Sequence, residues 1–484
     1  MPEDKITPLL KHSLEHIHLL GISGAAMAPL AGMLKERGYT VTGSDANVYP
    51  PASTLLRSLS IPWKEGFRPE NLTPAPDLIV VGNAISRGNP ELEAALDARI
   101  AYWSMPQTLE ELFLPGRSSM VIAGTHGKTT TTAMLAWIFQ VAGRRPDFLI
   151  GGVVPNFGEG SYGLGGGEEF LVEGDEYDSA YFDKQPKFLH YHPQQLILTS
   201  LEFDHADIYE NLSAIELQFR RLVNLVPRRG KIFVWGEAEN LVACTKKAFC
   251  TVVSYGLTPE MDWCAGDIEW RDGMTYFRAV HHGKEAAQIR MPLAGRHNVM
   301  NALACVALSL ERGLERGAVE DALARFQGVR KRMEIKGEAD RVTIVEDFAH
   351  HPTAIGATIE AARSRWPGRR LWVAFEPRSN TMRRKIFADA LVEALALADG
   401  TLLGPVNRSQ LLSDEERLDP KQIAAEVRSR GIDAESFRSA AEIAEYLADR
   451  LKPGDVVLSM SNGSFDGLSG KLMEALEKRT AIRK

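Results

Sequence analysis

Short apolar runs alternate with longer amphipathic segments from the start of the chain. Apolar runs at 17–20, 39–42 and 77–81 each end in glycine or small polar residues. Between the first two, a segment that begins near Met27 and stops at Gly38 has the spacing of a helix. Buried strands separated by helical segments are typical of parallel sheets. The pattern therefore predicts an α/β fold that binds ligands at the carboxyl ends of its strands.

The same rhythm continues to the end of the chain. Further strand-like runs occupy 120–123, 147–154, 170–172, 196–200, 342–345, 371–375 and 455–460. One stretch, 230–291, is different, because its β-like pieces at 231–235, 251–255 and 274–278 are closely spaced. We expect this stretch to form a small antiparallel section at the edge of the central domain.

A chain of 484 residues is too long for one ordinary core. A linker is expected near 114–118, and a basic hinge near 328–333. These boundaries predict three domains: a Rossmann-like domain at 1–116, a central P-loop ATPase-type α/β domain at 117–327, and a Rossmann-like α/β domain at 328–484.

Composition narrows the class of partner. A net charge of −7 and a sequence pI near 6.0 argue against a general nucleic-acid binder. The four cysteines lack metal-type spacing, which favours free thiols in a reducing compartment. The first twenty residues contain no signal-peptide core, and no apolar run is long enough to span a bilayer. We expect a cytoplasmic protein with no membrane or nucleic-acid partner.

A glycine-rich loop follows the run at 120–123 and precedes a helix-like segment at 131–142. A glycine loop, a lysine and hydroxyls at a helix start form a phosphate cradle. In this reading Lys128 contacts the outer phosphates of ATP, and Thr129 binds Mg²⁺. The common loop would need a glycine at Ile122, so this one is shorter. The alternative is a glycine turn whose lysine faces solvent. The loop consists of Gly124, Thr125, His126, Gly127, Lys128, Thr129 and Thr130.

Acidic residues and a histidine follow two neighbouring strand-like runs. Glu173 ends the run at 170–172, and Asp204-His205 follows the run at 196–200. A carboxylate at a strand end beside a phosphate loop is a usual Mg²⁺ ligand. An acidic, solvated loop and a structural histidine are the alternatives.

The first strand also ends in a glycine-rich turn. Compared with the dinucleotide fingerprint G-x-G-x-x-G, the second glycine is Ser23 and the third is Ala26. Asp45 lies at the right distance to bind a ribose hydroxyl. A nicotinamide cofactor, another nucleotide and a simple tight turn all remain open. Two nucleotide-type loops in one chain suit an enzyme that uses ATP and a nucleotide-linked substrate.

Polar loops follow three strand-like runs of the C-terminal region, at 346–352, 376–381 and 461–464. Parallel strands bring such loops together, so we expect one cleft that faces the central domain. We expect Arg378 to bind a carboxylate or phosphate in this cleft. The alternative is that Arg378 is an ordinary surface cation. Asn298, near a helix start, either caps that helix or hydrogen-bonds a base.

Taken together, these loops resemble one family, the Mur ligases. The resemblance rests on G-T-H-G-K-T-T at 124–130, the strand end at Glu173, the Asp204-His205 loop, R-H-N-V-M-N-A-L-A at 296–304 and D-F-A-H-H-P-T at 347–353. Mur ligases are ATP-dependent amide-bond-forming enzymes of bacterial cell-wall precursor synthesis. The motifs occur in the family's order over nearly the whole chain.

The resemblance implies roles for individual residues. It gives catalytic roles to Lys128, Glu173, His205 and Arg332, and metal binding to Thr129, Glu173 and His205. It adds Asn298 at adenine, Arg332 at the γ-phosphate and Asp347 at the ribose to the ATP site. It assigns the UDP-sugar to Gly21, Ser23, Gly24, Asp45 and Ser86. Other branches use a carbamylated lysine, for which this chain has no secure counterpart.

The first domain is most similar to the branch that joins UDP-N-acetylmuramate to L-alanine, but the C-terminal loops depart from it. Phe348 and Ala349 stand where that branch has tyrosine and glycine. The runs at 375–383 and 460–467 also differ, and resemble the recycling branch, which attaches the tripeptide L-alanyl-γ-D-glutamyl-meso-diaminopimelate in one step. The implied peptide-binding residues are Phe348, Arg378, Asn380, Ser461 and Asn462. The L-alanine-adding reaction is the close alternative, and a nicotinamide oxidoreductase or a regulator without chemistry are the distant ones. Monomer and homodimer both remain open.

Overall fold

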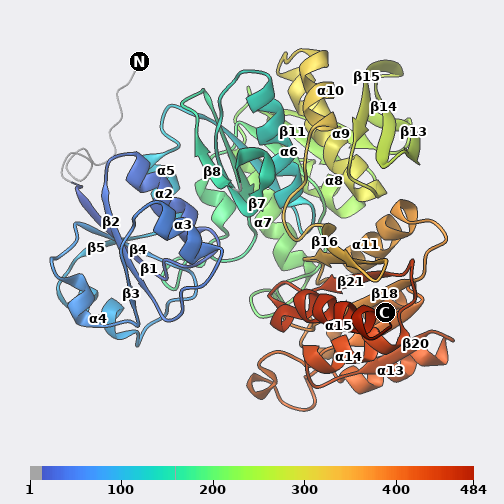
Figure 1. Ribbon diagram of the computed structural model, residues 1–484. Helices are drawn as coiled ribbons and strands as arrows, with labels where there is room; N and C mark the ends of the chain where they lie inside the picture. Colours follow the sequence, from blue (N-terminus) through green and yellow to red (C-terminus); the bar gives the residue numbers. More distant parts are fainter. Residues whose placement is uncertain (1–13, 159, 484) are drawn as a thin grey trace. The chain divides into compact units, whose positions relative to one another are not determined.

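The computed structural model describes residues 14–158 and 160–483 (Figure 1). The chain divides into two compact units. The first comprises Met1–Leu201, Ile215–Ser254 and Leu308–Val319, and the second comprises Glu202–Ala214, Tyr255–Ala307 and Glu320–Lys484. The expected α/β class is confirmed, whereas the three domain boundaries stay a prediction. None of the described helices is long and apolar enough to cross a membrane.

The first sheet of the first unit is entirely parallel, in the order β3-β2-β1-β4-β5. Its strands are β1 (His16–Leu20), β2 (Thr40–Asp45), β3 (Trp63–Glu65), β4 (Leu78–Val81) and β5 (Ala101–Ser104). Its helices are α2 (Met27–Glu36), α3 (Ala52–Ser58), α4 (Pro90–Asp97) and α5 (Met105–Leu112), with a 3₁₀ turn η1 (Pro69–Leu72). The strand order reverses at β1, so the loop after β1 lies at a topological switch point, where such sheets bind ligands.

The second sheet of this unit contains the neighbouring strands β11-β10-β6-β9-β7-β8. They are β6 (Ser118–Ala123), β7 (Asp147–Val154), β8 (Gly160–Leu164), β9 (Glu169–Gly174), β10 (Gln195–Leu198) and β11 (Lys231–Trp235). Between these strands lie helices α6 (Lys128–Val141) and α7 (Leu212–Leu225) and the 3₁₀ turns η2 (Pro155–Phe157) and η3 (Lys187–His190). Helix α8 (Glu239–Thr245) follows β11. Because β6 lies between β9 and β10, the loops that follow these three strands meet.

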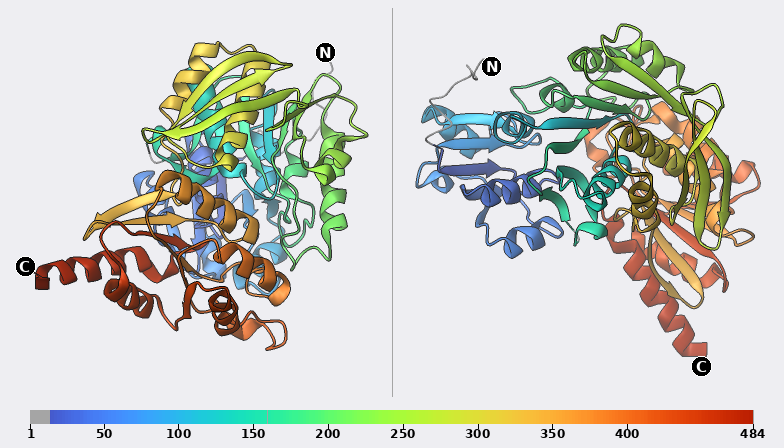
Figure 2. Two further views of the ribbon diagram at one scale, coloured as in Figure 1. Left: turned by 90° about the vertical axis from the view of Figure 1, so that its right-hand side faces the viewer. Right: turned by 90° about the horizontal axis from the view of Figure 1, so that it is seen from above.

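The expected antiparallel section is smaller than 230–291. Strand β11 pairs in parallel with β10, and β12 (Thr251–Gly256) pairs in parallel with β13 (Trp263–Arg271). Within 230–291, only β13, β14 (Met274–His281) and β15 (Lys284–Met291) pair antiparallel with one another, the yellow-green arrows of Figure 2. The expectation was wrong for β11 because its centre, Ile232 to Val234, is continuously buried, which is typical of a parallel strand covered on both faces.

The C-terminal sheet, in the second unit, has the order β16-β17-β21-β18-β19-β20. Only β16 (Glu334–Ala339) is antiparallel to its neighbour. The other strands are β17 (Val342–Asp347), β18 (Leu371–Phe375), β19 (Gly400–Leu403), β20 (Asp433–Ser436) and β21 (Val456–Met460). Helices α9 (Arg296–Glu311) and α10 (Arg316–Ala324) precede this sheet in the chain, and residues Leu308–Val319 within them belong to the first unit. The helices of the C-terminal region are α11 (Pro352–Arg365), α12 (Ala388–Leu395), α13 (Pro420–Ser429), α14 (Ala440–Arg450) and α15 (Leu468–Arg483), with 3₁₀ turns η4 (Lys385–Phe387), η5 (Ser409–Leu411) and η6 (Phe465–Gly467).

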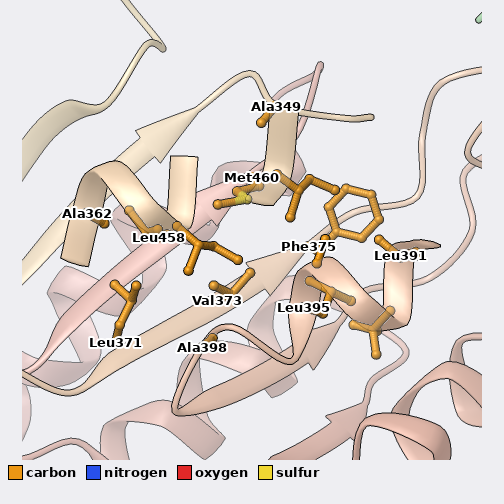
Figure 3. Packing of buried hydrophobic residues seen from close by; sticks show 14 of the residues in the cluster. Ala349, Ala362, Leu371, Val373, Phe375, Leu391, Leu395, Ala398, Leu458 and Met460 are labelled. Carbon is orange, nitrogen blue, oxygen red and sulfur yellow. The ribbon is translucent and has the colours of Figure 1, made fainter. Parts of the chain in front are cut away.

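Alternate residues of these strands fill two cores. Val373, Phe375 and Leu458 pack against α11, α12 and α13 on one face (Figure 3). Trp372 and Val457 pack against α14 and α15 on the other. Two covered faces hold the strands rigidly and leave the loops at their carboxyl ends as the place for a site.

Candidate active site

The glycine-rich loop lies between β6 and α6, as the sequence predicts. Gly127, at the N-terminus of α6, has a φ of 84°. The end of β10 fixes the loop, because the Thr125 N–H donates to the Ser200 carbonyl (3.2 Å) and the His126 N–H donates to Ser200 Oγ (2.8 Å). A Cβ atom at Gly124 would lie 2.1 Å from Thr199 Oγ1. Glycine is therefore required there.

Lys128 does not face solvent. Its Nζ donates to the Gly124 carbonyl (2.6 Å) and pairs with Glu176 Oε2 at 2.9 Å. Burial disfavours its charge, but the carboxylates of Glu176, Asp175 and Glu173 outweigh burial and raise the pKa of Lys128. The loop thus holds a charged ammonium group where the helix N-terminus also attracts anions.

Thr129 and Glu173 are brought together, as expected for a metal pair. Thr129 Oγ1 donates to Glu173 Oε2 at 2.9 Å, and the Gly151 N–H donates to the other carboxylate oxygen. Burial raises the pKa of Glu173, and the charge of Asp175 raises it further. A hydroxyl and a carboxylate oxygen are ligands that Mg²⁺ prefers, and a cation would offset the crowding of negative charge. The residues present therefore fit a magnesium ion.

The loop after β1 is tied to the end of β2. The Ser23 N–H and Oγ donate to Asp45 Oδ2 at 3.0 and 2.6 Å, and the Gly21 N–H donates to the Ser44 carbonyl (2.8 Å). Gly24 belongs to the same turn, since its N–H donates to the Gly21 carbonyl. The Ser23 side chain thus fastens this loop to Asp45, at a position where the nucleotide fingerprint has glycine.

Beneath this loop lies a buried network that the sequence analysis missed. Glu91 accepts hydrogen bonds from His18 Nε2 (2.7 Å) and Ser44 Oγ (3.0 Å). In the sequence Glu91 is a glutamate in the first turn of a helix, where acidic residues are common, so nothing local indicates a further role. The fifth residue expected at the sugar nucleotide, Ser86, is exposed in the loop after β4.

Asn298 and Asp347 of the second unit are buried and bonded within it. Asn298 Nδ2 donates to the Ala294 carbonyl at 2.8 Å. Asp347 accepts from the backbone N–H groups of Met333 and Ala349, both at 2.7 Å. Burial raises the pKa of Asp347, although Arg332 opposes the rise. The nucleotide contacts expected for these residues stay predictions.

Arg332 stands above the Phe348 ring, with its guanidinium carbon 4.9 Å from the ring centroid. This cation–π contact leaves the edge of the guanidinium group available for hydrogen bonds. The contact to a γ-phosphate stays a prediction.

The polar loops of the second unit meet in one cleft of about 350 Å³, as the sequence predicts for strand-end loops. His350 follows β17, Arg378 follows β18 and Asn462 follows β21. The loop after β19 and the segment Glu202–Ala214 also contribute, which the sequence analysis did not foresee. The lining residues are Asp204, His205, His350, Arg378, Ser379, Asn380, Thr381, Arg383, Asn407, Arg408 and Asn462.

Of the five residues expected to bind the peptide, Arg378, Asn380 and Asn462 line this cleft, and Phe348 and Ser461 do not. Ser461 is instead buried, and its Oγ donates to Glu376 Oε2. Glu376 in turn pairs with Arg378 Nη1 at 3.5 Å. Ser461 thus supports Arg378 through Glu376.

Asp204 carries a full negative charge in the cleft. It accepts from Thr381 Oγ1 and from the His205 N–H, both at 2.7 Å. Burial opposes ionisation, but His205 and His350 outweigh it and lower the pKa of Asp204 to about 2. The arginines of this cleft can bind an anionic substrate, and a neutral imidazole beside them can accept a proton.

Comparison with known proteins identifies the family. Mur ligase models match three stretches: the Mur ligase family catalytic domain at 16–116, the Mur ligase middle domain at 176–309 and the Mur ligase glutamate ligase domain at 331–463. Over 465 residues the chain is 40% identical to the UDP-N-acetylmuramate–L-alanyl-γ-D-glutamyl-meso-2,6-diaminoheptandioate ligase of Escherichia coli (strain K12), with 96% of this chain and 98% of the relative covered. The chain belongs to the Mur ligase family.

Two further Mur ligases are similar to this chain over most of its length. The crystal structure of a murein peptide ligase from Psychrobacter arcticus 273-4 is 37% identical with a TM-score of 0.73, and covers 96% of this chain and 99% of its own. The UDP-N-acetylmuramate–L-alanine ligase of Desulfitobacterium hafniense (strain Y51) is 33% identical over 93% of this chain and 97% of its own. Both reactions weighed from the sequence thus occur among its relatives.

Proposed function

We propose that this Mur ligase joins the lactyl carboxylate of UDP-N-acetylmuramate to the amine of L-alanyl-γ-D-glutamyl-meso-diaminopimelate, at the expense of ATP. The observation that carries the proposal is the higher identity to the tripeptide ligase, 40% against 33% for the L-alanine ligase, each over most of the chain. The reaction would serve peptidoglycan recycling in the cytoplasm, and so cell-wall biogenesis, cell shape and cell division. Family membership leaves the nicotinamide alternative without support.

A carboxylate is a poor acyl donor, because its leaving group would be oxide. In the proposed first step a lactyl carboxylate oxygen attacks the γ-phosphorus of ATP, which breaks the bond to ADP and forms an acyl phosphate. Lys128 and Arg332 offset the repulsion between the two anions. The ammonium of Lys128, held at the start of α6, supports this role.

Magnesium is the ion that the pair Thr129 and Glu173 would hold. The metal role expected for His205, which belongs to the second unit, stays a prediction. When bound, the ion supplies positive charge that offsets the charge of the phosphate oxygens. The 2.9 Å contact between the Thr129 hydroxyl and the Glu173 carboxylate supports the assignment. Titration of the protein with Mg²⁺ would measure how many ions the site binds.

In the second step the peptide amine attacks the acyl carbon, phosphate leaves with the bonding electrons and the nitrogen loses a proton. An α-amino group has a pKa of about 8, so a useful share is neutral without a strongly perturbed base. His350, His351 and a nearby carboxylate are candidates to accept this proton, and the place of His350 in the cleft wall supports His350. Acyl phosphates hydrolyse in water, so we expect closure about the hinge near Gly328 to protect the intermediate.

The decisive experiment supplies two amines in parallel. The purified protein, ATP, Mg²⁺ and UDP-N-acetylmuramate are incubated with either the tripeptide or L-alanine, and phosphate release and the ligated product are measured. We expect efficient ligation of the tripeptide and little of L-alanine. A preference for L-alanine would assign the protein to the other branch, and phosphate release without either amine product would exclude both.

A further inference from the structure

Arg383 is an unusual residue of the cleft. Its side chain lies in the cleft wall, yet the residue is only 8% exposed. One Nη donates to the Asn380 Oδ1 and the other to the Asn407 carbonyl at 3.5 Å, while Nε is buried without a hydrogen-bond partner. A guanidinium group has five N–H donors, so much of its capacity is unused.

No carboxylate of the described residues forms an ion pair with Arg383. Asp207 attracts it only from beyond ion-pair distance, and is itself hydrogen-bonded to Asn380 Nδ2 at 2.6 Å. Burial lowers the pKa of Arg383, and repulsion by Arg408 and Arg384 lowers it further. A buried charge without a counter-ion is costly, so its retention calls for an explanation.

Two more guanidinium groups share the cleft. Arg378 pairs with Glu376, and its stem packs on Gly463, where a Cβ atom would lie 2.3 Å from Arg378 Nε. Arg408 is exposed and forms no ion pair with the part of the chain that the structure describes. Against these three cations the cleft wall contains one carboxylate, Asp204. The cleft therefore favours a ligand with several negative charges.

We propose that Arg383, together with Arg378 and Arg408, binds the carboxylates of the incoming peptide that L-alanine lacks, and so selects the tripeptide over the single amino acid. The inference rests on the proposed function and names residues that determine its specificity. L-Alanine has one carboxylate, next to the reacting amine, whereas the tripeptide has three, distributed along its length. The planar fork of arginine matches a carboxylate in two hydrogen bonds.

Oxygen anions of the same shape also occur on ATP, so the experiment must separate the two sources. Arg383→Met keeps the apolar volume of the stem and removes the charge. We expect the KM for the tripeptide to rise at least tenfold, and the KM values for ATP and UDP-N-acetylmuramate to stay within twofold. A rise confined to the KM for ATP would assign Arg383 to a phosphate and overturn the proposal.

A tripeptide whose carboxylates are converted to amides tests recognition directly. If Arg383 had only a structural role, its replacement would not change the ratio of the KM values for the amide and the tripeptide. For the wild-type protein, the KM for the amide should be at least tenfold higher than the KM for the tripeptide. Arg383→Met should use the two with similar KM values, because the group that distinguishes them is gone. Undiminished discrimination by Arg383→Met would overturn the proposal, even though wild-type ligation of the tripeptide had upheld the proposed function.

The matched control is Arg384→Met. Arg384 is the next residue but pairs with Glu416 at 2.6 Å outside the cleft, so its loss should leave the KM for the tripeptide unchanged. Thermal unfolding of each variant verifies folding. Because Arg383 has no ion-pair partner, its replacement leaves no buried carboxylate unpaired and should not lower the Tm. An equal rise in KM from both variants would attribute the effect to general charge and refute the specific role of Arg383.

Discussion

Single side chains in the two units have roles that their sequence positions only partly reveal. Lys128 was assigned from the loop motif, because lysine before hydroxyl residues at a helix start has few other uses. Arg383 was not, because it is one of three arginines in the short loop segment 378–384, and nothing in the sequence distinguishes their roles. Folding separates Arg383, buried in the cleft wall, from Arg384, which pairs with Glu416. Only the tertiary structure distinguishes such neighbours.

At this scale we predict that Lys128→Ala lowers kcat at least roughly 10²-fold, the loss typical of one group that stabilises transition-state charge. Phosphate release and product formation should fall together, because Lys128 acts before the amine enters. Lys184→Met is the control, since Lys184 is largely exposed beside Asp178. Near-normal turnover by Lys128→Ala would mean that this loop does not bind the transferred phosphate.

At the scale of elements, the carboxyl ends of strands were predicted better than the partners of each strand. The loops after β17, β18 and β21 do share a cleft, because parallel strands end at one edge. The place of β11 was missed, because a short apolar run fits either kind of sheet until its neighbours are known. The contribution of Glu202–Ala214 to the second unit has no local signal either.

The loop after β21 offers a test of how these elements position Arg378. Gly463→Ala places a methyl group 2.3 Å from Arg378 Nε, so the guanidinium group must move. We expect the KM for the tripeptide to rise roughly threefold to tenfold, the cost of weakening a hydrogen bond, with the KM for ATP unchanged. Gly470→Ala is the control, because nothing lies within 4 Å of its Cβ position. Equal KM values for Gly463→Ala and wild type would show that Arg378 does not contact the peptide.

Helix α5 and turn η3 are joined by a charge cluster that should make their contact depend on pH. His190 bridges Glu110 and Asp183, each at 2.7 Å. Burial opposes its charge, but both carboxylates outweigh burial and raise the pKa of His190 above 6.5. A raised pKa stabilises the folded state fully below 6.5, and this contribution is lost as pH rises through the raised value. Glu110, whose pKa falls to about 2 despite burial because of His190 and His192, contributes above its ordinary 4.5.

His190→Gln should therefore lower the Tm by a few degrees at pH 5.5, where both contributions are present, and by much less at pH 9.5. Thermal unfolding monitored by circular dichroism at the two pH values measures the difference. His282→Gln, at an exposed position of the antiparallel section, should have little effect at either pH. An equal loss for His190→Gln at both would mean that its charge does not stabilise the contact.

At the scale of the whole molecule, the residues assigned to ATP are divided between the two units. Lys128 and Glu173 belong to the first, whereas Asn298, Arg332 and Asp347 belong to the second. The chain passes between the units at several places, two of which lie within helices α9 and α10, and the linkers expected near 114–118 and 328–333 stay predictions. Such crossings are decided by contacts between distant segments, which no local pattern contains.

This division makes Arg332 the residue whose loss should reveal cooperation between the units. If its guanidinium group meets the γ-phosphate held by Lys128, Arg332→Met should lower kcat roughly 10²- to 10³-fold, because transition-state charge loses a donor. Binding of UDP-N-acetylmuramate, measured by calorimetry without ATP, should be unchanged. Arg330→Met is the matched control, since Arg330, two residues before Arg332, pairs with Glu334 at 2.8 Å. Normal kcat for Arg332→Met would mean that the second unit contributes no arginine to phosphoryl transfer, and that Lys128 and the metal ligands stabilise the transferred phosphate without it.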